Sequence, residues 1–293
     1  MKAQRLTNVL HTFIIDPVKL ITRKKSGLIS FIGLLIYILM ALFGAYLVPL
    51  DTQPKPWKRY LPPSLEHPLG TDFEGKDIFS QIINGAGDVL YVAFLASTFT
   101  VVIATLLGSV SGFKGGLIDS LVMAVDEILL TIPQFPLLVV LAALIRLDNF
   151  TLALLLGALS WPALARAIRA QILSLKERDF IEAARALGLG LRHIIFVEML
   201  PNLLPYIVVS WILSMTGAIY SQVGLVFLGF VPFRSHNWGV MINLAWTWGA
   251  IYYKDSVWYI ISPIFAIIFF QLCTIYFASS LEELLNPRLR EAR

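Results

Sequence analysis

Charged residues are scarce in this sequence. Only 14% of its 293 residues are Asp, Glu, Lys or Arg, whereas 57% are hydrophobic and the mean hydropathy is +0.76. Soluble globular domains usually contain about 25% charged residues, so this composition excludes most chains that fold in water. The composition indicates a chain whose solvent is the lipid bilayer.

Cysteine and histidine are also rare. The one cysteine, Cys273, lies inside an apolar run, which excludes a disulfide framework within the chain. The four histidines stand in separate segments without metal-ligand spacing, at His11, His67, His193 and His236. No nucleophile elbow or triad-like set of residues is present, so the sequence favours neither a metal site nor a hydrolase.

The basic residues do not form one patch, although the net charge is +4 and the isoelectric point is about 9.1. This spread argues against a nucleic-acid partner and is typical of loops between membrane spans. The basic amino terminus precedes an apolar run that is longer than a signal-peptide core and lacks a clear cleavage site. We therefore expect a retained first span.

Six apolar segments are long enough to cross a bilayer as helices, which takes about 20 residues. Four are continuous, and the region 117–165 divides in two at a polar break after Ile145. The sequence thus predicts an all-α, polytopic membrane protein with six transmembrane helices. The continuous segments are 27–50, 89–113, 203–229 and 257–279.

Orientation follows from the distribution of Lys and Arg, which are more frequent in cytoplasmic loops. With the amino terminus inside, 16 of the 23 basic residues fall in inner segments, so we expect both termini to be cytoplasmic in a cell (inner or plasma) membrane. The expected division follows directly. It comprises a cytoplasmic segment 1–26, a first span 27–50, an extracytoplasmic loop 51–88, a five-helix core 89–280 with a cytoplasmic loop 166–202, and a cytoplasmic tail 281–293.

The predicted inner loop carries a short amphipathic helix. Phe180, Ala183, Ala184 and Leu187 recur at helical spacing and give one small, apolar face, and Gly188 stands where the helix would end. Arg178, Glu182 and Arg185 occupy the remaining positions. Periodicity alone leaves two alternatives, a helix lying on the membrane surface and a docking surface for a partner protein.

The spacing of this loop resembles a known motif. Glu182-Ala183-Ala184, Gly188 and Leu200-Pro201 fit the pattern of the EAA loop of ABC importer permeases, with Glu198 at the position where the family has isoleucine. In that family the loop forms a coupling helix in a cleft of the ATPase subunit. The resemblance implies that the ATPase-docking residues are Arg178, Glu182, Ala183, Ala184, Arg185 and Gly188.

Further stretches are similar to the dipeptide and oligopeptide branch of that family, among them 67–72, 227–229, 237–239 and 286–290. The resemblance implies a permease that forms half of a path for oligopeptides or similar-sized solutes such as oligosaccharides. It implies as partners two cytoplasmic ATPase subunits, a second homologous permease in a heterodimer, an extracytoplasmic solute-binding protein and membrane lipids. It implies no cofactor in this chain, because the partner subunits bind ATP.

One stretch nearly matches a nucleotide-binding P-loop but does not fit its chemistry. In Gly70–Asp77 the final position is Asp77 in place of the Ser or Thr that ligates magnesium, and Asp72 and Glu74 would repel phosphate. We therefore expect no ATP site here and no enzymatic activity in the chain.

Asp126 and Glu127 lie within an apolar run, where ionisable residues face protein or water and often carry function. A structural or interface role and a proton or ion relay are both open, and the relay would make the chain an ion-coupled secondary transporter. Pro133 and Pro136 follow and predict a kink, so Asp126, Pro133 and Pro136 are candidate pathway or gate residues.

Aromatic residues crowd the predicted outer end between the fifth and sixth spans. An interfacial aromatic belt explains them. A surface for a solute or for the binding protein is the alternative, and its candidates are Trp238, Trp246 and Trp248.

Overall fold

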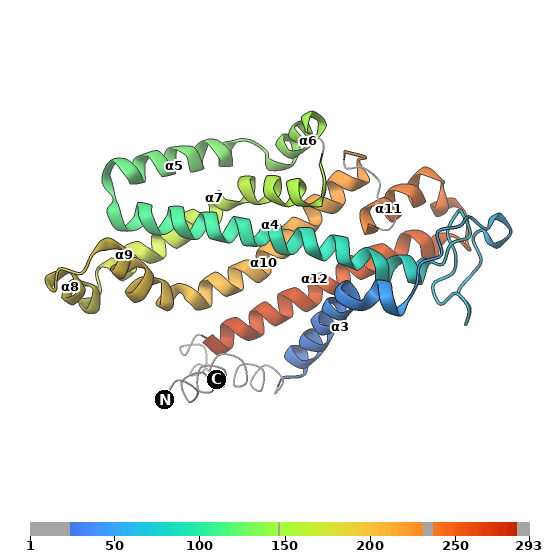
Figure 1. The fold of residues 1–293 in the computed structure, drawn as a ribbon, viewed down its shortest axis with the longest axis horizontal. Coiled ribbons are helices and arrows are strands. Elements are labelled where there is room, and N and C mark those ends of the chain that lie inside the picture. Colours follow the sequence, from blue (N-terminus) through green and yellow to red (C-terminus); the bar gives the residue numbers. More distant parts are fainter. Residues whose placement is uncertain (1–23, 146, 231–236, 286–293) are drawn as a thin grey trace. The chain divides into compact units, whose positions relative to one another are not determined.

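The computed structural model describes residues 24–145, 147–230 and 237–285. This part of the chain is helical without a β-strand, and an isolated bridge joins Thr71 to Asp77. In chain order (Figure 1) the elements are α3 (Lys25–Leu47), the 3₁₀ turn η2 (Pro56–Lys58), α4 (Ile78–Lys114), α5 (Gly116–Thr131), α6 (Gln134–Leu144), α7 (Asn149–Lys176), α8 (Asp179–Ala186), α9 (Leu191–His193), the π-helical turn η3 (Ile194–Met199), α10 (Leu200–Phe227), α11 (Trp238–Thr247), the 3₁₀ turn η4 (Ala250–Tyr252) and α12 (Val257–Leu285).

Six membrane spans are available among the described residues. Five continuous helical stretches are long and apolar enough to cross a bilayer, and the bent pair of α5 and α6 supplies a sixth. The all-α, polytopic architecture expected from the sequence is confirmed, and the described helices account for five spans, or six when the bent pair counts as one. The cytoplasmic placement of both termini stays a prediction.

Two helices extend beyond their expected limits into polar sequence. Helix α4 begins at Ile78, where we expected loop up to residue 88, and Asp77 caps it by accepting the Ser80 N–H at 2.7 Å. The polar side chain of Asn84 is accommodated in the helix because it donates to the Val48 carbonyl. Helix α7 likewise continues to Lys176, so the first part of the expected loop 166–202 belongs to a span.

The described residues form two compact units, which are treated separately. The first unit contains α3, the start of α4 up to Tyr91, residues 226–229, α11 and α12. The second unit contains α4 from Val92 onward and the chain through Leu225.

In the first unit α3 packs along α12 (Figure 1) through a face of small residues. A Cβ on Gly33 would lie 2.3 Å from the sulfur of Cys273, so a larger residue would force the thiol or one of the helices to shift. Tyr37 donates its hydroxyl to the Ala266 carbonyl at 2.6 Å. These contacts join the first span of the chain to the last.

In the second unit α4 packs closely on α7. A Cβ on Gly108 would lie 2.5 Å from the Ala165 carbonyl oxygen, and a Cβ on Gly157 would lie 2.4 Å from Phe99. Small residues let the two backbones approach within membrane helices, where packing replaces the hydrophobic effect. This seam fixes α7, the helix that leads into α8.

The connection between α5 and α6 is an abrupt bend of 88°. Ile132 is extended at φ −86° and ψ 126°, as expected for a residue that precedes a proline. Pro133 therefore ends α5, whereas Pro136 lies in the first turn of α6, where no backbone N–H is needed. The expected kink is present at Pro133, and Pro136 contributes none.

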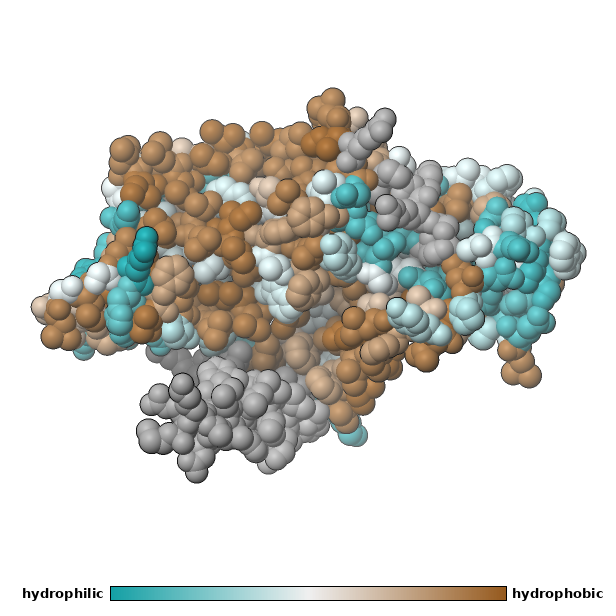
Figure 2. Space-filling view, in the orientation of Figure 1, coloured by the Kyte–Doolittle hydropathy of each residue, from teal (hydrophilic) through white to brown (hydrophobic). Residues whose placement is uncertain are grey.

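Large apolar side chains remain exposed on the spans, as lipid-facing helices require. On the face in Figure 2 hydrophobic residues cover most of the helical surface, and hydrophilic residues gather over the 51–77 loop. On α3 the exposed apolar residues include Ile29, Leu39, Leu42 and Phe43. Soluble proteins rarely expose so much continuous apolar surface, so these faces fit contact with lipid.

Candidate functional site

We define the EAA segment as residues 182–201, and α8 forms its first part at one end of the second unit (Figure 1). Ile181 and Ala184 are buried in a core shared with α7, η3 and α10. Phe180, Leu187 and the other α8 positions are exposed. The helix is thus anchored by residues three apart, and Ala184 lies inside the fold instead of on the small exposed face that the sequence led us to expect.

Gly188 ends α8 in a Schellman motif. Its N–H donates to the Arg185 carbonyl at 2.9 Å, and the Leu189 N–H donates to the Ala184 carbonyl at 3.1 Å. Gly188 has φ +72°, which a residue with a Cβ adopts only with strain, although no atom lies within 4 Å of a Cβ built there. Backbone conformation, not lack of space, therefore explains glycine four residues after Ala184.

The second part of the EAA segment is the π-helical turn η3, which runs into α10. Pro201 follows at once in the first turn of α10, and a wider helical turn accommodates the carbonyl that a proline leaves without a donor. Glu198, the residue that departs from the motif, lies 3.4 Å from the ring of His193 across this turn. The segment therefore keeps a continuous helical path despite the proline.

Arg185 and Lys176 both contact the ring of Phe113 at the end of α4. The Arg185 guanidinium carbon lies 5.0 Å from the ring centroid and the Lys176 ammonium lies 5.8 Å from it. Such cation–π contacts are worth about 0.5–1 kcal/mol at exposed sites. They connect α8 and the end of α7 to α4, a role for Arg185 that the sequence did not indicate.

Asp126 is fully buried on α5 and pairs with Arg166 of α7. Its Oδ2 accepts from Nε at 3.0 Å and from a terminal guanidinium nitrogen at 2.5 Å. Asp119, two helical turns earlier, accepts both nitrogens of the Arg169 fork. Glu127 is exposed and forms no ion pair with any described residue. Asp126 is thus held in an arginine pair instead of lying in a chain of carboxylates.

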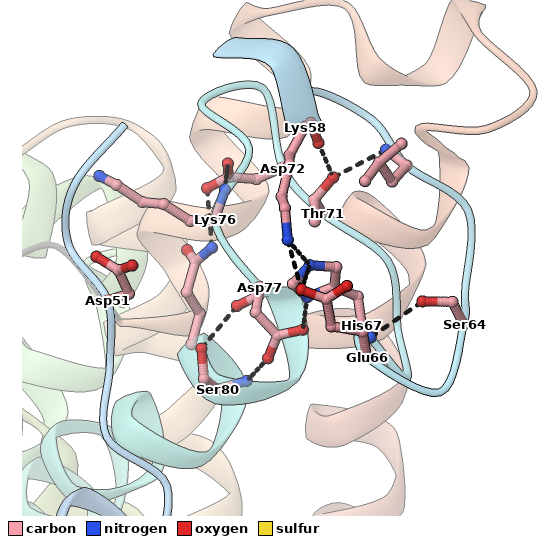
Figure 3. A network of polar contacts seen from close by, with 12 residues as sticks. Asp51, Lys58, Ser64, Glu66, His67, Thr71, Asp72, Lys76, Asp77 and Ser80 are labelled. Carbon is pink, nitrogen blue, oxygen red and sulfur yellow. Dashed lines mark hydrogen bonds and ion pairs between the residues drawn. The ribbon is translucent and has the colours of Figure 1, made fainter. Parts of the chain in front are cut away.

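The 51–77 loop is ordered by a dense polar network (Figure 3). Asp72 is buried and accepts the N–H groups of Glu74 and Lys76 at 2.8 Å each, as well as the Gln81 amide. In Figure 3 the His67 ring lies between Lys58 and Asp77, 3.1 Å from the Asp77 carboxylate. The carboxylates of the P-loop-like stretch are therefore engaged in folding the loop.

Burial and partners shift the pKa values of this loop in opposite directions. Burial raises the pKa of the Asp72 carboxyl above its ordinary value, although three hydrogen bonds act against the shift. The hydrogen bond from Lys55 lowers the pKa of Asp51, and the one from Lys58 lowers the pKa of Glu66. Asp72 is a structural carboxylate whose charge is disfavoured by its surroundings.

The three tryptophans proposed as outer contacts separate into two groups. Trp238 is fully buried and donates its indole N–H to the Ile82 carbonyl at 3.0 Å, so it has no surface to offer a partner. Trp246 and Trp248 are exposed, and Trp248 stacks on Phe73 at 4.9 Å between ring centroids. The prediction for Trp238 is wrong because its indole packs inside the first unit.

Comparison with known proteins gives a consistent result. Residues 104–291 match the model of the family described as binding-protein-dependent transport system inner membrane component. The chain belongs to this family. The permease is 33% identical to a putative peptide permease protein of Brucella suis over 77% of this chain and 74% of that protein. It is 30% identical to the dipeptide transport system permease protein of Bacillus subtilis over 94% of this chain and 86% of that protein. It is also 30% identical to the oligopeptide transport system permease protein of Haemophilus influenzae over 92% of this chain and 86% of that protein.

Membership settles the class of transporter. The permease is the membrane component of an ATP-driven, binding-protein-dependent importer, and separate ATPase subunits hydrolyse the ATP. The alternative of an ion-coupled transporter is therefore wrong, and the arginine pair of Asp126 supplies the physical reason for its buried carboxylate. An ATPase and a substrate-binding protein are general partners of such permeases.

Sequence reasoning missed two features of the permease. Ile181 was not distinguished from its neighbours, although it is the deepest residue of α8. The sequence also did not indicate that Arg166 and Arg169 each pair with a particular aspartate of α5. The sequence pattern that could have predicted these pairs is one of helical spacing. The two arginines are three residues apart on α7, and the two aspartates are seven residues apart on one face of α5.

Proposed function

We propose that this permease forms half of the translocation path of an importer for peptides, and that the EAA segment seats it on an ATPase subunit. The arrangement of α8 carries the proposal. Ile181 and Ala184 hold the helix on the core, while Glu182, Ala183 and Arg178 stay at the surface for a partner. A helix that is anchored in this way and is charged on its exposed side can be displaced by a bound ATPase without unfolding.

The proposed complex contains two ATPase subunits, a second homologous permease and an extracytoplasmic binding protein. In it the binding protein delivers the solute, and closure of the ATPase pair displaces α8. The spans then exchange between outward-open and inward-open arrangements. Both termini and the EAA segment lie on the cytoplasmic side, as the distribution of Lys and Arg indicates.

Docking is tested by purifying the complex with its co-encoded subunits through a tag on the permease. We expect Glu182→Lys and Gly188→Asp to reduce the bound ATPase about tenfold or more, since an interface contact or its backbone support is lost. Glu282→Lys makes the same change at an exposed position of α12 and should retain the ATPase. Unchanged association in both EAA variants would overturn the docking role.

Peptides are the proposed cargo because three relatives are described as peptide, dipeptide and oligopeptide permeases. Oligosaccharides are the second candidate. The co-encoded binding protein should be titrated with defined peptides of two to five residues and with oligosaccharides of similar mass. Saturable binding of peptides alone supports the proposal, and binding of oligosaccharides alone contradicts it.

A further inference from the structure

Two ion pairs form a ladder between α5 and α7. Asp119 pairs with Arg169 and Asp126 pairs with Arg166, so the order along α5 is the reverse of the order along α7. Residues seven apart lie two turns apart on one helical face. A slip of one helix along the other by one turn would therefore break both pairs.

The ladder is a poor device for stability alone. The Asp126 side chain has no exposed surface, and its Oδ1 has no hydrogen-bond donor among the described residues. Removing such a carboxylate from water costs several kcal/mol, and apolar residues of similar volume often stabilise as well or better. Ion pairs differ from apolar contacts in that they specify the register of one helix along the other.

One end of the ladder is joined to α8. Helix α7 ends at Lys176 and α8 begins at Asp179. Ile172 of α7 and Ile181 of α8 are fully buried in one core. The cation–π contacts with Phe113 also join the end of α7 and α8 to the end of α4. A displacement of α8 is therefore imposed on the end of α7 that carries Arg169.

The other end of the ladder leads to the bend at Pro133. Asp126 is six residues before Ile132, where α5 stops and the chain turns by 88° into α6. Beyond the bend Gln134 donates to the Ser160 hydroxyl at 2.7 Å, and the Phe135 ring lies where a Cβ on Gly224 would be 2.9 Å away. The ladder thus stands between α8 and a break in a span.

We propose that Asp119, Asp126, Arg166 and Arg169 are positioning residues that carry the displacement of α8 to the α5–α6 bend and so couple ATP hydrolysis to opening of the path. This inference rests on the proposed docking of the ATPase at the EAA segment. It requires that loss of the ladder uncouples the bend while the ATPase stays bound.

The test uses the complete complex in liposomes, with Cys273→Ser as the background because Cys273 is the one cysteine of the chain. Spin labels on cysteines at the exposed positions Leu121 of α5 and Leu144 of α6 report the distance across the bend. We expect ATP with vanadate to change this distance in the parent protein and not in Asp126→Asn. The stimulation of ATP hydrolysis by the co-encoded binding protein should fall about tenfold, a factor within the usual range for coupling between two sites.

Glu127→Gln removes the neighbouring exposed carboxylate and should leave both readouts unchanged. Asp119→Arg places two arginines together in a pair that is partly exposed, so it tests the ladder even if Asp126→Asn does not assemble. Adding Arg169→Asp to it restores opposite charges and should restore coupling. A distance change of parental size in Asp126→Asn and Asp119→Arg, or a reversed pair that fails to recover, would overturn the inference. Loss of the ATPase from these variants would also overturn it, whereas a parent complex that binds no ATPase would refute the proposed function.

Discussion

Leu189 donates its backbone N–H to the carbonyl of Ala184, at 3.1 Å, across the turn made by Gly188. This bond links the last residue of the Glu-Ala-Ala triplet to the residue just beyond the glycine. The Ala184 side chain lies in the core that holds α8, and the Leu189 side chain packs against that core. The fixed spacing between triplet and glycine is therefore the length that a capped helix end requires.

Gly188→Ala should weaken binding of the ATPase through backbone strain. A Cβ at φ +72° costs about 1–2 kcal/mol relative to glycine, which frays the last turn of α8. Gly190→Ala is the matched control, because Gly190 has φ −68° and equally open surroundings. Co-purified ATPase and hydrogen exchange at Leu189 measure the effect, and equal behaviour of the two variants would contradict it.

Arg166→Gln should destabilise the permease more than Asp126→Asn. The first change strands a carboxylate with no exposed surface, whereas the second leaves an arginine whose side chain is 54% exposed and can turn to water. Leaving a buried charge without its partner costs about 3–5 kcal/mol. Thermal unfolding in detergent measures the difference. A larger loss of stability in Asp126→Asn than in Arg166→Gln would contradict the finding that Asp126 is the buried member of the pair.

Asp72 should make the 51–77 loop less stable as the pH rises. Its folded pKa is raised above the unfolded value of 3.8, so the folded loop holds its proton where the unfolded chain has lost it. The stability contribution is complete below pH 3.8 and is lost as the pH rises through the folded pKa. Asp51 and Glu66, whose pKa values are lowered, contribute the opposite slope.

Asp72→Asn isolates this effect. The amide oxygen still accepts from the backbone, and Gln81 can turn its own amide to accept from the new nitrogen. We expect the variant to fold and to remove the falling part of the pH profile, measured by limited proteolysis of the loop between pH 3.5 and 7. High salt, which screens the exposed Asp51 and Glu66 pairs, separates their contribution. A profile identical to that of the parent would show that Asp72 is not the group responsible.

Trp238→Phe should lower stability by about 1–3 kcal/mol, because the indole fills the interior of the first unit and donates to Ile82. Trp246→Phe, at an exposed position of α11, should change stability by less than about 0.5 kcal/mol. Thermal unfolding of both variants in the same detergent tests the contrast. Similar losses would mean that the two indoles share one environment.

The sequence predicted the spans well and the contacts within them poorly. Long apolar runs such as the one in α12 determine helices in lipid almost alone. The start of α4 was predicted too late because Asp77 and Asn84 are polar. In a sequence, a polar residue with a partner inside the protein looks the same as one in a loop. The positive φ of Gly188 followed from its place after a helical run, but the inward turn of Ala184 depends on which side of α8 meets the core. Tertiary packing decides that, and residue type does not.

The packing of α3 on α12 determines the order in which the permease can mature. The first span leaves the ribosome long before Cys273 is synthesised, so the glycine face of α3 has no partner on α12 for most of translation. Lys24 cannot meet Glu283 until the last span has been made. The first unit is therefore completed only when α12 has been made, and a chain cut short before Val257 leaves the glycine face of α3 without its partner helix.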